Sequence, residues 1–194
     1  MSQVLDELVS LLSMEPIEED LFRGASQDLG FRQMFGGQVL GQSLSAASQT
    51  VGDGRLVHSL HGYFLRPGDA GLPVVYQVER VRDGGSFSTR RVTAIQKGKT
   101  IFTCAASFQG IEEGFHHQAQ MPEVPGPETL RSETVLARLV ADKLPERLRE
   151  RAVHDKPIDI RPVSLNNPFD PKPADPVKHV WFRADGALPD NPAL

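Results

Sequence analysis

One stretch decides the fold: Phe35-Gly-Gly-Gln-Val-Leu-Gly-Gln-Ser-Leu-Ser-Ala-Ala-Ser48. It lies within residues 33–52, where no Asp, Glu, Lys, Arg or His occurs, although charged residues make up 24% of the chain. Its apolar and small residues recur at the spacing of one helix face, at Val39, Leu40, Ser43, Leu44 and Ala47. The stretch therefore predicts a helix.

The surroundings of this helix follow from its other face. A helix on a domain surface usually carries charged residues there, whereas this one has an uncharged polar stripe of Gln38, Gln42, Ser45 and Gln49. Gln and Ser also interrupt it too often for a membrane span, which needs about 20 mostly apolar residues. We therefore predict a buried helix, wrapped by the rest of a soluble domain, with close backbone approach at Gly37 and Gly41. An ordinary core helix of an α/β protein is the alternative that this segment alone leaves open.

Extended segments follow the helix. Residues 56–66, 73–82, 86–97 and 99–109 are rich in β-branched, aromatic or large apolar residues and are separated by turn residues such as Asp83-Gly84-Gly85 and Lys97-Gly98. In the last segment Phe102, Cys104, Ala106 and Phe108 alternate with smaller or polar residues. Parallel strands need a long crossover between them, and these turns are too short for one. The sequence therefore predicts an antiparallel sheet and an α+β fold.

The chain changes character after about residue 109, since 12 of its 15 prolines lie beyond Met121. We interpret residues 1–109 as a first unit and residues 110–157 as a linker with short helices. Strand-like segments at 158–163 and 179–184 then resemble a restart of the first unit, so residues 158–194 are predicted to open a second, incomplete copy.

Composition limits the kinds of partner and compartment. The net charge of −4 argues against a nucleic-acid surface, which is normally basic. The single cysteine excludes an internal disulfide and a Cys-based zinc site. We see no secretory signal at the N-terminus. A reducing, cytoplasmic location is expected.

Few residues qualify for chemistry. In a regular strand, His58 and His61 are three residues apart and would face opposite sides, so we expect no shared metal ion, although His58 remains a candidate base. Cys104 is expected in the core. Positive charge gathers on the strands and offers a place for phosphate groups, with solvated surface arginines as the alternative; the residues are Arg66, Arg80, Arg82, Arg90 and Arg91.

Four motifs resemble the acyl-CoA thioesterase II family: Phe35-Gly-Gly-Gln-Val-Leu-Gly-Gln42, His58-Ser-Leu-His-Gly-Tyr-Phe-Leu-Arg-Pro-Gly-Asp69, Arg82-Asp-Gly-Gly-Ser-Phe-Ser-Thr-Arg-Arg91 and Ala106-Ser-Phe-Gln109. The resemblance implies a double hot-dog fold, in which each of two units wraps an antiparallel sheet around a long helix. It also implies hydrolysis of fatty acyl-CoA without a metal or organic cofactor.

The family's water-activating Asp, Thr and Gln come from the second unit, and none of them can be assigned in this chain. We therefore expect the catalytic half to lie outside these 194 residues. His58 is the catalytic candidate within them, and the candidate substrate-binding residues are Phe35, Gly36, Gly37, Gln38 and Arg66. The chain is expected to pair with a second copy or with that C-terminal half. A non-catalytic acyl-CoA-binding protein is the alternative.

Overall fold

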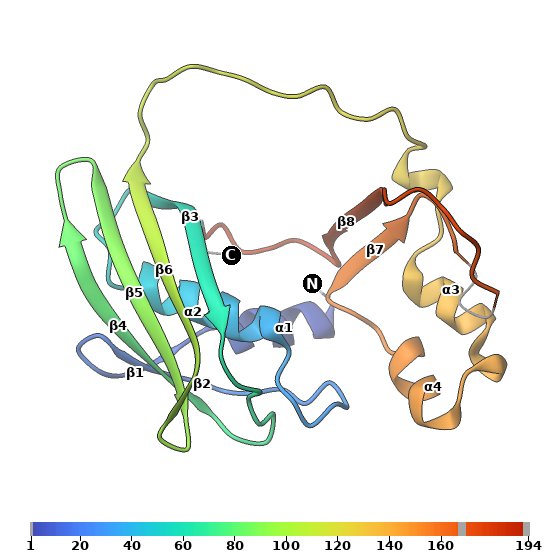
Figure 1. The fold of residues 1–194 in the computed structure, drawn as a ribbon, viewed down its shortest axis with the longest axis horizontal. Helices are drawn as coiled ribbons and strands as arrows, with labels where there is room; N and C mark the ends of the chain where they lie inside the picture. The colour runs from blue at the N-terminus through green and yellow to red at the C-terminus, as the bar shows by residue number, and fades with distance from the viewer. Residues whose placement is uncertain (1, 167–169, 192–194) are drawn as a thin grey trace. The chain divides into compact units, whose positions relative to one another are not determined.

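The computed structural model describes residues 2–166 and 170–191 (Figure 1). The chain divides into two compact units, Glu7–Gly114 and Phe115–Leu188. Residues 2–6 belong to the Phe115–Leu188 unit, and residues 189–191 belong to the Glu7–Gly114 unit. None of the helices in the described part of the chain is both long and apolar enough to cross a membrane.

The predicted central helix is α2, Gly36–Ser48. Its buried residues include polar as well as apolar side chains: Gln38, Val39, Gln42, Ser43, Ala46 and Ala47. Only Gly37 is exposed among its residues, so the prediction of a largely buried helix is confirmed. The polar stripe is tolerated there because its amides are paired; Gln42 is fully buried and donates to the carbonyls of Leu11 and Ala25.

A six-stranded antiparallel sheet lies against α2 in the order β1-β2-β4-β5-β6-β3 (Figure 1). Its strands are β1 Glu15–Glu18, β2 Leu21–Gly24, β3 Arg55–Phe64, β4 Val74–Asp83, β5 Phe87–Gln96 and β6 Lys99–Gly110. The four predicted strands are confirmed as β3 to β6, and the parallel α/β alternative is wrong. Strand β1 was not predicted from the sequence, because all four of its residues are exposed and show no alternation. Before it comes α1, Gln3–Leu12.

The inner face of the sheet forms the core with α2. In β6 the residues Phe102, Cys104, Ala106 and Phe108 are buried, as their alternation predicts. Burial raises the pKa of the Cys104 thiol to about 11, so this side chain stays protonated at neutral pH and acts as a small core residue.

The expected close backbone contacts at Gly37 and Gly41 are wrong. A Cβ at Gly41 would meet only the tip of the Leu12 side chain, at 2.9 Å, and one at Gly37 would meet the neighbouring Phe35 ring. One tight position is Gly62 in β3, where a Cβ would lie 2.6 Å from Cζ of the buried Phe102 ring. The sequence pointed to the helix glycines because their one-turn spacing can be read from it. Crowding between neighbouring strands, as at Gly62, cannot be read from the sequence.

Gly62→Ala is therefore expected to lower the free energy of unfolding by about 1–3 kcal/mol, the usual cost of overpacking a core. Gly41→Ala is the matched control, because the Leu12 tip can rotate and alanine favours a helix by roughly 1 kcal/mol over glycine. Urea unfolding followed by circular dichroism measures both. A Gly62→Ala protein as stable as the parent would contradict the crowding.

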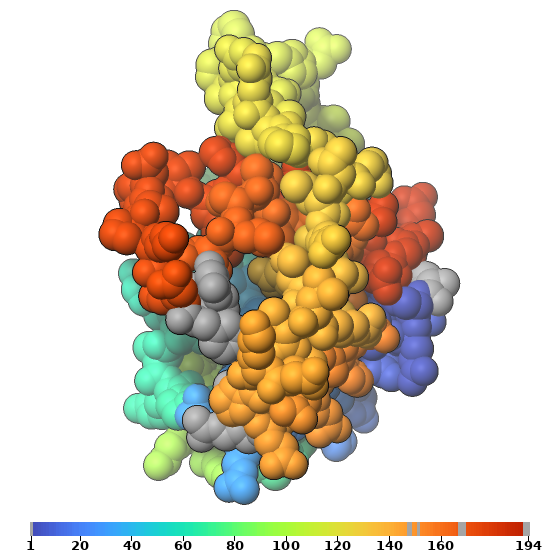
Figure 2. Space-filling model, turned by 90° about the vertical axis from the view of Figure 1, so that its right-hand side faces the viewer, coloured from blue at the N-terminus to red at the C-terminus, as the bar shows by residue number. Residues whose placement is uncertain are grey.

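The Phe115–Leu188 unit contains η1 Pro127–Thr129, α3 Glu133–Leu139, η2 Ala141–Lys143, α4 Glu146–Val153, β7 Ile158–Pro162 and β8 Val180–Ala184. Figure 2 shows the surface that α3 and α4 contribute, in orange. The strands β7 and β8 pair antiparallel, with Arg161 opposite Trp181. These two side chains donate to the carbonyls of Pro127 and Pro125, so they hold the preceding segment on the hairpin. Residues 167–169 and 192–194 of the predicted 158–194 segment lie outside the described residues.

Candidate functional site

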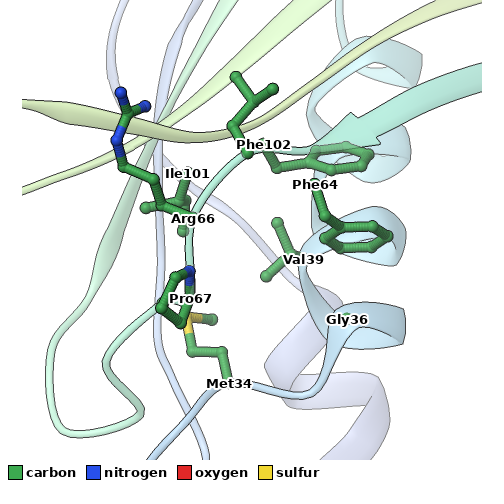
Figure 3. A pocket seen from close by; sticks show the side chains of 10 residues that line it. Met34, Gly36, Val39, Phe64, Arg66, Pro67, Ile101 and Phe102 are labelled. Carbon is green, nitrogen blue, oxygen red and sulfur yellow. The ribbon is translucent and has the colours of Figure 1, made fainter.

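A pocket of about 390 Å³ lies at the start of α2, within the Glu7–Gly114 unit (Figure 3). Its lining residues are nearly all apolar: Met34, Gly36, Val39, Phe64, Leu65, Arg66, Pro67, Gly68, Ile101 and Phe102. Val39, Ile101 and Phe102 are buried and form its floor, whereas Phe64 and Leu65 are exposed at its rim. An open apolar recess of this kind suits a flexible hydrocarbon chain.

Two aromatic rings shape one side of the pocket. The rings of Phe64, at the end of β3, and Phe102, in β6, have centroids 4.7 Å apart. A Cβ at Gly36 would lie 3.0 Å from the Phe64 ring. Glycine at the start of α2 therefore lets this ring lie against the helix end.

The loop after β3 forms the opposite wall. The backbone N–H groups of Leu65 and Arg66 both donate to the Ile101 carbonyl, and the Met34 N–H donates to the Gly68 carbonyl. Gln96 also holds this loop in place, since its amide oxygen accepts a hydrogen bond from the Asp69 N–H at 2.8 Å. The Lys97 ammonium, 2.9 Å from Asp69 Oδ2, holds the pKa of that carboxyl below its usual value.

Arg66 is the charged residue of the pocket. Its guanidinium donates to the Thr100 carbonyl and points away from Val39 and Phe64 (Figure 3). No ion pair joins it to a carboxylate among the described residues. Other arginines of the predicted cluster are already compensated, since Arg80 pairs with Asp20 and Arg91 with Glu79.

At Arg90 both interpretations of the arginine cluster, as a phosphate-binding surface and as solvated surface residues, are wrong. Arg90 is only 1% exposed, so it belongs neither to a phosphate-binding surface nor to a solvated one. Its position in β5 turns the side chain to the inner face of the sheet, where it donates to Thr50 and to Asp83. Alternation along β5 explains why Arg91 points outward instead.

The pocket brings together some of the predicted substrate-binding residues. Gly36 and Arg66 line it. Phe35 is 61% exposed beside the helix start, and Gly37 is exposed as well, but neither lines the pocket. The Gln38 side chain turns inward and donates to the Ala25 carbonyl at 3.0 Å.

His58 lies apart from the pocket. It is exposed, its Nε2 is 2.8 Å from Ser107 Oγ, and its ring meets the edge of Phe87. The expectation that His58 and His61 face opposite sides is wrong, because a shift in register between Val57 and Ser59 adds one residue to β3. His61 then lies opposite Ala105, on the same outer face as Ser107.

Comparison with known proteins gives this site a context. Residues 26–109 match the family model of the acyl-CoA thioesterase N-terminal domain. The chain is also 47% identical, over 97% of its length, to acyl-CoA thioesterase 2 of Haemophilus influenzae. The chain belongs to the acyl-CoA thioesterase II family.

Other relatives agree with this assignment. Human acyl-coenzyme A thioesterase 8 is 43% identical over 93% of the chain. The crystal structure of acyl-CoA thioesterase II TesB2 from Mycobacterium marinum is 39% identical and superposes with a TM-score of 0.71 over 96% of the chain. The chain spans 66%, 59% and 63% of the lengths of these three relatives.

The hot-dog fold expected from the resemblance is confirmed. A protein from Alicyclobacillus acidocaldarius described as having a hot-dog fold superposes with a TM-score of 0.71 at 21% identity, over 95% of the chain. The helix wrapped by an antiparallel sheet is thus the hot-dog arrangement of the acyl-CoA thioesterase II family.

Several residues that line the pocket were not predicted from the sequence. Phe64 stands inside the long motif from His58 to Asp69, and the alternation of β6 turns Phe102 inward, so both carried a signal. Met34 carried none, because its place depends on the Gly68 loop, which is distant in sequence.

Proposed function

We propose that the protein hydrolyses fatty acyl-CoA to a free fatty acid and CoA, and that the Glu7–Gly114 unit binds the acyl chain. The apolar pocket at the start of α2 is the observation that carries the proposal. Membership of the acyl-CoA thioesterase II family supports it, since relatives bear that activity in their names.

The reaction needs a polarised carbonyl and an activated water. Water attacks the thioester carbon, the carbon–sulfur bond breaks, and the CoA sulfur takes up a proton as the acid leaves. The start of α2 carries unpaired N–H donors and partial positive charge, so Gly36 and Gly37 are suited to the thioester carbonyl. Phe35 and Gln38 flank this helix start, and we propose that Phe35 contacts substrate beyond the pocket.

The alternative, a non-catalytic acyl-CoA-binding protein, rests on one observation. No Asp, Glu or His occurs among the described residues that line the pocket, so a base must come from elsewhere. His58 remains our candidate within this chain, although it lies on the outer face of the sheet.

Thiol release from a long-chain acyl-CoA, followed with a thiol-reactive dye, tests hydrolysis directly, with the Haemophilus influenzae relative as positive control. Calorimetric titration with a non-hydrolysable thioether analogue measures binding in parallel. Binding together with thiol release supports the proposal. Tight binding without release, both by this chain and by the chain joined to the expected catalytic half, supports the alternative. An unchanged rate of thiol release in His58→Asn would exclude His58 as the catalytic base.

Arg66→Gln is expected to weaken acyl-CoA binding by about two- to fivefold, because an exposed ion pair with a phosphate contributes about 1 kcal/mol or less. Binding of an acyl-pantetheine, which lacks the nucleotide phosphates, should not change. Arg91→Gln is the matched control, since Arg91 is also exposed but already paired with Glu79. Equal losses with both ligands would contradict a phosphate contact.

We further propose that residues 158–194 open a second hot-dog unit and that residues 110–157 connect it to the first. The antiparallel β7–β8 pair supports this. The edge strand β3, with Tyr63 and Phe64 exposed, favours pairing with a second copy or with a further segment of the same protein. A monomer in light scattering at all concentrations would argue against self-association. We also propose a cytoplasmic location.

A further inference from the structure

A second recess lies close to the first in the Glu7–Gly114 unit. It measures about 400 Å³ and is lined by Ser13, Glu15, Arg23, Ala25, Ser26, Ala70, Gly71 and Pro73. The two recesses share no lining residue. They approach each other where the loop after β3 passes from Gly68, in the first, to Ala70 and Gly71, in the second.

The Met34 side chain lies at this junction. It lines the first pocket, and its sulfur is 3.6 Å from Ser26 Oγ, which lines the second. The same sulfur is 3.6 Å from the Gln96 amide nitrogen. A Cβ at Gly68 would lie only 3.0 Å from it, so the sulfur is packed on several sides.

The polar groups behind Met34 are occupied by stronger partners. Ser26 has one hydroxyl hydrogen, which is directed at the Leu72 carbonyl 2.5 Å away. The Gln96 amide nitrogen has two, with the carbonyls of Leu72 and Asp69 at 2.8 and 3.0 Å. The sulfur is therefore held by packing alone. A methionine has three rotatable bonds and moves more easily than a branched side chain.

We infer that Met34 determines which acyl chains the protein accepts, as a side-chain partition between the two recesses. The inference rests on the proposed function, because it takes the first pocket as the acyl site. With Met34 in place, the chain ends against the sulfur. When Met34 is shortened, the first pocket opens towards Ser26 and admits a longer chain.

The test measures chain-length profiles on the folded chain. Binding of free fatty acids of increasing length is followed by calorimetry, and thiol release from the matching acyl-CoA series is followed with a thiol-reactive dye. Affinity should rise about fourfold for each further methylene group that is buried, until the partition stops the chain. Met34→Ala should extend this rise to longer chains, and Met34→Phe should end it earlier.

Met14→Ala is the matched control, because Met14 is a buried methionine of the core that lines neither recess. It should keep the parent profile even if its melting temperature falls. Met34→Val replaces Met34→Ala if the latter does not fold. Met34 variants that are folded but keep the parent profile, or that weaken all chain lengths by one factor, overturn the inference.

The two readouts separate this inference from the proposed function. A profile for free fatty acids that shifts with Met34 would support the partition. If no variant then releases thiol, alone or joined to the expected catalytic half, hydrolysis is contradicted. Thiol release together with a fatty-acid profile that does not shift in the Met34 variants would support hydrolysis and contradict the partition. Absence of fatty-acid binding by the folded parent chain overturns the partition.

Discussion

Arg90→Met is expected to lower the free energy of unfolding by about 1–3 kcal/mol for each of the two buried Thr50 groups that lose their donor. Arg90 is 1% exposed and donates to Thr50 Oγ1, to the Thr50 carbonyl and to Asp83 Oδ1. Methionine fills similar space but leaves both Thr50 groups without this donor. Since Thr50 lies just beyond α2, the change should loosen the contact between the helix end and β5.

Arg91→Met serves as the control for Arg90→Met. Arg91 is 57% exposed, and its pair with Glu79 should contribute no more than about 1 kcal/mol. Urea unfolding of the two variants at neutral pH measures the difference. Equal effects at these neighbouring positions would contradict a special role for the buried guanidinium.

The carboxylate partner adds a dependence on pH. Arg90 and then Ser88 hold the pKa of Asp83 below its usual value. A lowered pKa in the folded state contributes stability above the unfolded pKa, and this is lost as the pH falls through the folded pKa. Asp83→Asn should therefore destabilise the protein at neutral pH and converge with the parent below about pH 4.

Gln42→Leu is the second substitution with a large expected effect. The Gln42 amide is fully buried, donates to the carbonyls of Leu11 and Ala25 at 2.7 and 2.8 Å, and accepts from the Tyr76 hydroxyl at 2.7 Å. Leucine would leave the Leu11 carbonyl and the Tyr76 hydroxyl unpaired, at about 1–3 kcal/mol each. Burial raises the pKa of Tyr76 far above its usual value, so the effect should not vary with pH in the neutral range.

A double-mutant cycle makes this prediction specific. Gln42→Leu with Tyr76→Phe removes the donor and the acceptor together, so its cost should be smaller than the sum of the two single changes. Gln49→Leu, on the exposed end of the same polar stripe, should stay within about 0.5 kcal/mol of the parent. Strict additivity in urea unfolding would show that the Tyr76–Gln42 hydrogen bond does not couple the two residues.

The sequence was sufficient for those features that depend on local periodicity. A charge-free stretch with helical spacing identified α2 as buried, and alternation in β6 identified Phe102 and Phe108 as core residues. Short turns such as Lys97-Gly98 left room only for antiparallel pairing. Each of these follows from backbone geometry within one element and its immediate neighbours, so one sequence is enough.

Only the tertiary structure decided the features that depend on contacts between distant segments. The register shift in β3 turned His58 and His61 to one face, and nothing in the local spacing announces an extra residue in a strand. Arg90 became a core residue because Thr50 and Asp83 supply oxygen atoms where an unpaired guanidinium would not be tolerated. The pocket exists because the Met34 and Gly68 segments dock on each other, and that docking is determined by packing across the fold.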